Sequence, residues 1–385
     1  MNKENDSEEK EYLKQFSNKI RLLIASNYFK AVLFLIVLYL FLFSINLLSH
    51  SFKLFGKGFA EALLTTTSNP FIGLMIGIFA TSLIQSSSTT TSIVVGLVAA
   101  GTVNLQNAIP IIMGANIGTT VTNTIVSIGH IGNRIEFRRA FAGSTVHDIF
   151  NILAVIVLFP LEYFFHIIEK TALVFEKLFV NIGGAKLFNP LKYIIKPLIK
   201  VVDSWVEGLP HPEIILAILA IMLLFFSLVY IVKLMKSMVM KKIEAFMDKY
   251  LFKNTLTSFT LGLLFTATVQ SSSATTSIVV PLVGAGILNI NQIFPYTLGA
   301  NIGTTVTAIL AALATSNTVA ITVAFSHLVF NILGICIFLP LRRIPITLAL
   351  KISYFAAKSK KHTILTIMIY FTIFLIPLVI IIFFN

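Results

Sequence analysis

Two long stretches of the chain contain no Asp, Glu, Lys or Arg. They cover residues 62–133 and 254–341, which are 72 and 88 residues long. The whole chain is 12% charged and 56% hydrophobic, whereas a soluble domain averages about 25% charged residues. Charge-free stretches of this length hold several segments of the ~20 residues that cross a bilayer as a helix. The chain is therefore predicted to be an all-α polytopic membrane protein.

Each charge-free stretch contains a copy of the same polar block. The segment 85–95, QSSSTTTSIVV, returns at 270–280 as QSSSATTSIVV. A second block, GANIGTTVT, occurs at 114–122 and again at 299–307, identical at nine of nine positions. Three blocks recur in the same order, the third being HDIFNIL at 147 and HLVFNIL at 327. The order indicates an internal duplication.

Basic residues lie at opposite ends of the two copies. Arg134, Arg138 and Arg139 fall inside the first copy, whereas the matching segment of the second, near 316–318, is uncharged. Six lysines precede the second copy between residues 233 and 253. Lys and Arg concentrate in cytoplasmic loops, so the pattern predicts two inverted-topology repeats with re-entrant hairpins and discontinuous helices. This architecture is common in secondary transporters, and a cell (inner) membrane location with a cytoplasmic N-terminus is expected.

The predicted organisation has seven parts. They are a cytoplasmic tail at 1–30, a first span at 31–48, repeat 1 at 58–165, an extracytoplasmic loop at 166–213, a linker span and cytoplasmic loop at 214–253, repeat 2 at 254–345, and a cytoplasmic loop with the last span at 346–385. Within the repeats, hairpins are expected near 71–101 and 258–287 and broken spans near 108–128 and 293–314. Further spans are expected at 141–160, 214–232, 320–341 and 364–384.

The duplicated serine block predicts an anion site. Eight polar residues in a row are costly in a membrane unless they line a cavity or bind a ligand. Ser is a good helix N-cap, and a helix that starts here presents free N–H groups and a positive dipole end. The alternative is that these residues only pack helices together. The candidate anion-binding residues are Gln85, Ser86, Ser87, Ser88, Ser271, Ser272, Ser273, Asn116 and Asn301.

The GANIGTT motif predicts a cation site. Its glycines permit irregular backbone with unpaired carbonyls, and Pro110 and Pro295 lie just upstream. Carbonyl, amide and hydroxyl oxygens suit a hard cation such as sodium. The alternative is a small-residue packing face. The candidate contributors are Asn116, Thr119, Thr122, Asn301, Thr304 and Thr307.

Charge balance links the two motifs. A doubly negative oxyanion in a site without Lys or Arg needs more than the roughly half charge that each helix end supplies, so a bound cation is expected as a co-substrate. Asp148 is the one acid placed well inside a predicted span, and an intramembrane acid indicates function. Its alternatives are a pair with His147 or an interfacial position. The matching residue in repeat 2 is Leu328, which predicts a cation site in one half only.

Other classes of function fit poorly. The net charge of +13 is explained by cytoplasmic loops, so no nucleic-acid partner is expected. His147 and His327 lack the further ligand of a metal site and are expected to bond neighbouring helices. No Gly-x-Ser-x-Gly, P-loop or His-Glu-x-x-His motif occurs, so the chain is predicted not to be an enzyme. A passive anion channel using the same paired helix ends remains an alternative.

At these residues the chain resembles the type II sodium-phosphate cotransporter family. The two QSSS blocks, each followed by a GANIGT motif, carry the resemblance, together with VTNTIV at 121–126, EFRRAFAG at 136–143 and TVHD at 145–148. The resemblance implies sodium-driven uptake of divalent hydrogen phosphate by alternating access, with phosphate held by the QSSS regions. Inorganic phosphate, sodium and the lipid bilayer are then the expected partners, and no cofactor is expected.

The resemblance also implies particular sodium ligands. Asp148 corresponds to the acid of a site that marks electrogenic members, whereas electroneutral members have Gly there. Ala300 stands where some members carry Ser, and His130 where animal members carry Gln, so the ligand set differs locally. The candidate sodium-binding residues are Gln270, Ser271, Thr304, Thr307, Asp148, Asn151, Thr124 and Thr119.

Overall fold

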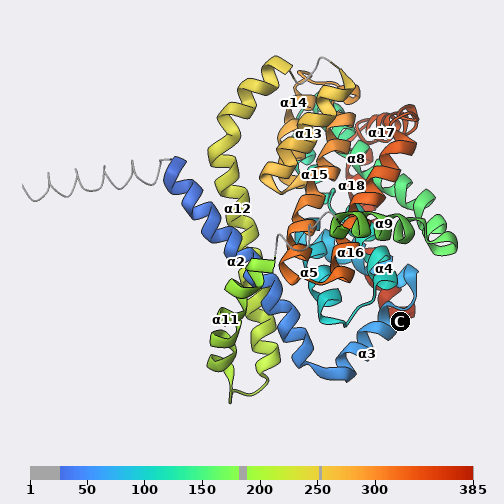
Figure 1. Ribbon diagram of the computed structural model, residues 1–385. Coiled ribbons are helices and arrows are strands. Elements are labelled where there is room, and N and C mark those ends of the chain that lie inside the picture. The colour runs from blue at the N-terminus through green and yellow to red at the C-terminus, as the bar shows by residue number, and fades with distance from the viewer. Residues whose placement is uncertain (1–26, 182–188, 251–253, 385) are drawn as a thin grey trace, which may run out of the picture.

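The described part of the chain is almost entirely helical, with no strand. A computed structural model describes residues 27–181, 189–250 and 254–384 (Figure 1). The predicted tail at 1–30 therefore lies almost wholly outside the described residues. The helices are α2 (Asn27–Leu54), α3 (Gly56–Thr67), α4 (Pro70–Ile84), α5 (Ser87–Ala100), α6 (Leu105–Gly118), α7 (Val121–Ile128), α8 (Arg134–Phe165), α9 (Ile167–Asn181), α11 (Asn189–Val206), α12 (Pro212–Tyr250), α13 (Thr255–Val269), α14 (Ser272–Gly284), α15 (Ile290–Thr315), α16 (Thr318–Phe338), α17 (Arg343–Ala356) and α18 (Lys360–Phe384).

Seven helical segments among the described residues are long and apolar enough to cross a bilayer. They are α2, α6 with α7, α8, α12, α15, α16 and α18. Mean hydropathy reaches 3.0 in the most apolar window of α12 and 2.8 in that of α18. Exposed leucine, isoleucine and phenylalanine side chains cover the outer faces of these helices, as expected for surfaces that contact lipid. The prediction of an all-α polytopic membrane protein is confirmed.

Two pairs of short helices form hairpins, and each of these helices is too short to cross a bilayer by itself. The first pair is α4 and α5, and the second is α13 and α14; their helices hold 13 to 15 residues. Both pairs are interrupted at the same place in the repeat. Gln85 and Gln270 each adopt the left-handed conformation with φ of 58°, which ends one helix, and the following serine starts the next.

The glycines of the GANIGTT motif bring helices into close contact. A Cβ atom on Gly114 would lie 2.1 Å from the carbonyl oxygen of Leu74, and one on Gly299 would lie 1.9 Å from that of Phe259. In the partner helices, a Cβ atom on Gly77 would lie 1.9 Å from the Ile111 carbonyl oxygen, and one on Gly262 would lie 2.0 Å from that of Tyr296. Helix α6 runs through Gly114, and α15 through Gly299. Gly114, Gly299 and Gly303 lie within helices, so the expectation of irregular backbone is wrong for these three, and a small-residue packing face is what the fold contains there. Gly118 is the last residue of α6, and the helix is interrupted directly after it.

The second broken span predicted near 293–314 is also wrong. Helix α15 is continuous over 26 residues, whereas its counterpart in the first half is interrupted between α6 and α7 at Thr119 and Thr120. Pro295 falls early in α15, where a missing N–H removes one hydrogen bond without ending the helix. The Ala- and Leu-rich segment 308–314 that follows has high helix propensity.

The tips of the two hairpins contact different parts of the molecule. At the end of α5, the carbonyl of Ala99 accepts a bond from the Asn317 side chain in the turn between α15 and α16. At the end of α14, Gly284 lies against the His130 ring and Gly286 against the Arg139 guanidinium. His130 lies in the turn between α7 and α8, and Arg139 lies near the start of α8. The two hairpin tips therefore reach different ends of the helix assembly. Inversion of the repeats across a membrane stays a prediction that these contacts support.

Candidate functional site

The two serine blocks meet at one cavity. This cavity has a volume of ≈ 370 Å³, within the range of about 300–1,000 Å³ that is typical of small-ligand pockets. It lies between the break joining α4 to α5, the break joining α13 to α14, and helix α12. The uncharged polar residues that line it are Gln85, Ser86, Ser88, Thr89, Gln270 and Ser271. Residues 185 positions apart in the repeat are thereby brought to the same space.

Each break is built as a helix start. The Ser86 hydroxyl accepts the backbone N–H of Thr89, and the Ser271 hydroxyl accepts that of Ala274, both at 3.2 Å. A helix start has four N–H groups without intrahelical partners, and the serine satisfies one of them. The remaining N–H groups and the dipoles of α5 and α14 favour a negative charge.

Hydrogen bonds brace the breaks and connect them to each other. Thr81 bonds Thr90 across the first hairpin at 2.9 Å, and Thr266 bonds Thr275 across the second at 2.7 Å. The Ser88 hydroxyl donates to the backbone carbonyl of Gln270 at 3.2 Å. Direct contact between the two copies sets the spacing of the two helix starts.

The remaining serine candidates lie just behind the lining. Ser87, Ser272 and Ser273 are buried in the first turns of α5 and α14. The Ser273 hydroxyl donates to the carbonyl of Thr119 at 3.3 Å, so one serine block also contacts the break between α6 and α7.

A lysine lies at this cavity, contrary to the expectation of a site without Lys or Arg. Of the described residues that line the cavity, Lys233 alone carries a charge. It comes from α12, and its ammonium lies 5.2 Å from the centre of the Tyr230 ring, within the range of a cation–π contact. In the sequence Lys233 reads as the first of six lysines of a cytoplasmic loop, so no local signal distinguishes it.

Three oxygen atoms of the predicted cation-site candidates have no hydrogen-bond partner among the described residues. They are Oγ1 of Thr122, Oε1 of Gln270 and Oγ1 of Thr307, all enclosed. The Thr304 hydroxyl donates to the Ala300 carbonyl at 3.0 Å and keeps its lone pairs. Buried polar atoms are rarely left without a hydrogen-bond partner. Side-chain oxygens of this kind are suitable ligands for a hard cation such as sodium. The chemistry of these residues therefore fits a cation.

Asp148 lies buried in α8 in a pocket of hydroxyl groups. The Thr124 hydroxyl donates to Oδ2 at 3.3 Å, and the Tyr370 hydroxyl lies 3.2 and 3.3 Å from the two carboxylate oxygens. His147 makes other contacts, so the alternative of an Asp148–His147 pair is wrong. Tyr370 lies on α18, 222 residues away, and reading the sequence missed it.

A buried polar network crosses between the repeats. His147 bonds the Asn301 amide oxygen at 2.6 Å, and His327 bonds that of Asn116 at 3.4 Å. Asn151 joins them, donating to the Asn116 carbonyl at 2.8 Å and accepting from Asn301 at 2.8 Å. Each histidine of one repeat thus contacts the GANIGTT motif of the other, as expected for residues that bond neighbouring helices. Asn116 and Asn301 belong to this network and not to the described lining of the cavity.

The sodium candidate Thr119 lies at the end of α6, next to the helix break. Its hydroxyl donates to the Ala115 carbonyl at 2.8 Å. Its own carbonyl accepts the bond from Ser273. Thr119 therefore connects the network region to the second serine block.

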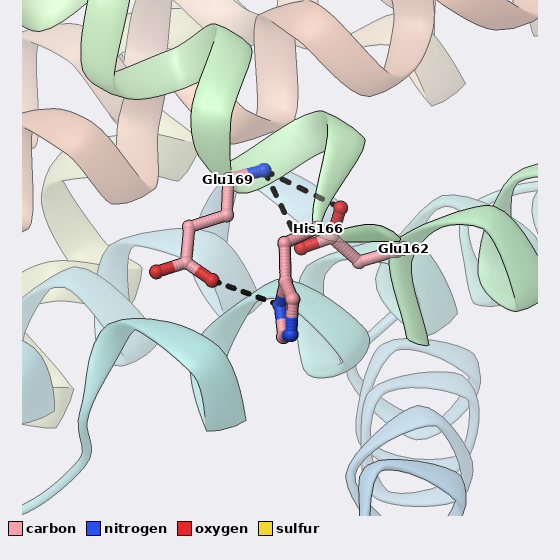
Figure 2. A group of neighbouring side chains, drawn as sticks. All are labelled: Glu162, His166 and Glu169. Atoms are coloured by element: carbon pink, nitrogen blue, oxygen red, sulfur yellow. Dashed lines mark hydrogen bonds and ion pairs between the residues drawn. The ribbon is translucent and has the colours of Figure 1, made fainter. Parts of the chain in front are cut away.

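A separate cluster of Glu162, His166 and Glu169 has ligand atoms within 4.8 Å of one another (Figure 2). The Glu162 carboxylate accepts the backbone N–H of Ile168 at 2.6 Å and of Glu169 at 3.3 Å, and His166 pairs with Glu169 at 3.1 Å. A carboxylate on the first N–H groups of α9 stabilises that helix start. These contacts explain why the three side chains lie together: they stabilise the corner between α8 and α9.

Comparison with known proteins identifies the family of the chain. The family model described as Na+/Pi-cotransporter matches residues 40–183 and 223–382. The chain is 33% identical to sodium-dependent phosphate transport protein 2B of Homo sapiens over 91% of its own length and 64% of that protein. It is 36% identical to sodium-dependent phosphate transport protein 2A of Ovis aries over 89% of its own length and 66% of that protein. No solved structure matches the chain. The chain belongs to the Na+/Pi-cotransporter family.

Proposed function

We propose that this protein is a sodium-coupled secondary active transporter that imports inorganic phosphate, as divalent hydrogen phosphate, and that it is electrogenic. The observation that carries the proposal is the convergence of two capped helix starts on one cavity. Relatives named for sodium-dependent phosphate transport support the substrate and the coupling ion. The chain spans 64–66% of the length of these relatives.

The phosphate is held by donors and not by a cage of cations. The first N–H groups of α5 and α14 and the serine hydroxyls point donors at an anion, and charge-assisted hydrogen bonds of this kind are about twice as strong as neutral ones. Lys233 offsets part of the double negative charge. Sodium ions at Gln270, Thr304 and Thr307, and at Asp148 with Thr124 and Asn151, offset the remainder and couple the movements of anion and cation.

Alternating access uses the duplicated architecture. The breaks of both hairpins meet at the cavity, and the histidine–asparagine network joins the two repeats. Rocking of one repeat against the other around a fixed site is the usual mechanism of such folds. The protein is placed in the cell (inner) membrane with a cytoplasmic N-terminus, where the membrane voltage contributes about 2.3 kcal/mol per charge per 100 mV.

Uptake of radiolabelled phosphate into proteoliposomes tests the proposal. With an inward sodium gradient, phosphate accumulates above its external concentration, and an inside-negative voltage increases the rate. A potassium gradient of the same size serves as the control. Phosphate flux that is indifferent to sodium and stops at equal concentrations would instead establish a passive anion channel.

Ser272→Ala is expected to raise the KM for phosphate by roughly 10- to 100-fold, because a hydrogen bond to a charged group contributes about 1.5–3 kcal/mol. Ser272 is the first residue of α14 and is buried beside the cavity lining. Initial rates of phosphate uptake measure the effect. Ser277→Ala is the matched control, since the Ser277 hydroxyl lies later in the same helix and donates to the Ala274 carbonyl at 3.1 Å. An unchanged KM for Ser272→Ala would leave packing as the role of this serine.

Lys233→Gln is expected to raise the KM for phosphate about three- to tenfold, because a charge near a partly solvated site acts at an effective dielectric constant of ~20 or more. The sodium dependence should stay unchanged, and the effect should shrink as ionic strength rises. Phosphate uptake at low and high potassium chloride measures both. Lys233→Arg keeps the charge, and the exposed Lys351→Gln on α17 is the control for a change in net charge. Equal KM values for wild type and Lys233→Gln at low salt would remove Lys233 from the site.

A further inference from the structure

A second polar cavity of ≈ 560 Å³ lies apart from the serine blocks. It is formed by the end of α2, by α11, and by the turn between α15 and α16. Figure 1 shows α11 beside the lower parts of α2 and α12, which it contacts. The polar residues that matter for its chemistry are His50, Lys53, Lys196, Lys200, Ser316 and Asn317.

This cavity collects more positive charge than nearby acids balance. Lys53, Lys196 and Lys200 line it, and none of the described residues that line it is acidic. Asp203 on α11 lies 3.2 Å from the His50 ring, and its single negative charge offsets only part of the three positive ones. Lys196 and Lys200 are four residues apart on one helix, where like charges repel each other. An anion bound between the three ammonium groups relieves that repulsion.

Uncharged donors complete the cavity. Ser316 adopts the left-handed conformation with φ of 53°, and its hydroxyl is enclosed without a hydrogen-bond partner among the described residues. Enclosed hydroxyls are normally paired, so a ligand atom is the natural partner. Ammonium and hydroxyl donors together are the groups that bind phosphate oxygens.

The surroundings of the cavity favour a lipid as the source of the phosphate. Helix α11 is amphipathic: Ile195, Val202 and Val206 are buried, while Val201 is exposed and Trp205 is 71% exposed. An amphipathic helix with an exposed Trp lies in the membrane interface. The cavity under this helix is then at the depth of lipid headgroups.

The expected topology strengthens this choice. The end of α2, the loop containing α11 and the turn between α15 and α16 are all predicted to be extracytoplasmic. Concentration of Lys in cytoplasmic loops therefore does not explain three lysines here. We propose that the cavity lined by Lys53, Lys196 and Lys200 binds the phosphate group of an anionic phospholipid. The proposal is independent of what the protein transports.

Thermal unfolding of the purified full chain in detergent tests this site. Titration with dioleoyl phosphatidylglycerol should raise the Tm of the wild type, whereas dioleoyl phosphatidylcholine should raise it much less. The double variant Lys196→Gln/Lys200→Gln should bind phosphatidylglycerol about tenfold more weakly or worse, since each lysine near an anionic lipid contributes measurably. Lys170→Gln/Lys177→Gln is the matched control, because it removes two exposed charges from α9, outside this cavity.

Two further measurements distinguish a lipid phosphate from free phosphate and separate loss of binding from loss of stability. Inorganic phosphate in sodium-free buffer is titrated against the same variants; stabilisation by it that the double variant loses would overturn the lipid assignment in favour of free phosphate. Lys53→Gln, on a different helix, should also weaken the binding of phosphatidylglycerol, whatever the stability of the double variant. Equal responses to the two lipids, or a wild-type response from both Lys53→Gln and the double variant, would overturn the site.

Discussion

Gly299→Ala is expected to prevent the protein from folding normally. The new Cβ would lie 1.9 Å from the Phe259 carbonyl oxygen and 2.8 Å from the Leu263 nitrogen. Both are backbone atoms of α13, so no side-chain rotation relieves the clash. The two helices must separate by more than ~1 Å along their contact, and overpacking of a close-packed interior costs about 1–3 kcal/mol or more. A strongly reduced monodisperse peak in size-exclusion chromatography, and a lower Tm for the protein that remains, measure this.

The chain offers a matched control and an internal repetition of the test. Gly58→Ala makes the same chemical change in helix α3, where a Cβ meets nothing within 4 Å, and should leave yield and Tm unchanged. Gly114→Ala, the equivalent change in the first repeat, would place its Cβ 2.1 Å from the Leu74 carbonyl oxygen and should be as damaging. Wild-type yield and Tm for Gly299→Ala would show that α13 and α15 are not packed this closely.

Asp148→Asn is expected to lower the charge moved per phosphate while uptake of phosphate remains measurable. Asparagine keeps the size of the side chain and one oxygen for Thr124 and Tyr370 to contact, but it loses the negative charge that binds a cation. One sodium ion fewer then moves in each cycle. The current from protein-containing membranes, divided by radiolabelled phosphate uptake at the same voltage, measures the ratio.

Tyr370→Phe separates charge from geometry in this experiment. It removes the hydroxyl that contacts both carboxylate oxygens at 3.2 and 3.3 Å and leaves the Asp148 charge in place. It is expected to weaken the apparent sodium affinity without changing the charge per phosphate. If Asp148→Asn and the wild type move the same charge per phosphate, Asp148 does not hold a coupled cation.

The residues that the sequence analysis missed share a physical cause. Lys233 lies at the cavity because α12 packs beside two hairpins, and Tyr370 lies at Asp148 because α18 folds back from the end of the chain. No local pattern marks such contacts between distant segments. The anion-site prediction depended on local features instead: a polar block in apolar sequence and serine as a helix cap. Those features are visible in any window that contains them.

The sequence by itself determined the membrane class, the duplication and the two serine-capped helix starts, because hydropathy and capping act over a few residues. It could not determine where the GANIGTTVT segments break. The nine residues are identical at 114–122 and 299–307, yet the first is interrupted and the second lies within one helix. In the first copy the Thr119 carbonyl accepts a bond from Ser273, and Asn123 bonds Thr276. The Ser273 hydroxyl satisfies a backbone carbonyl that an uninterrupted helix would pair internally, and the Thr276 hydroxyl holds the side chain of Asn123. Only the tertiary structure supplies these partners from the other repeat.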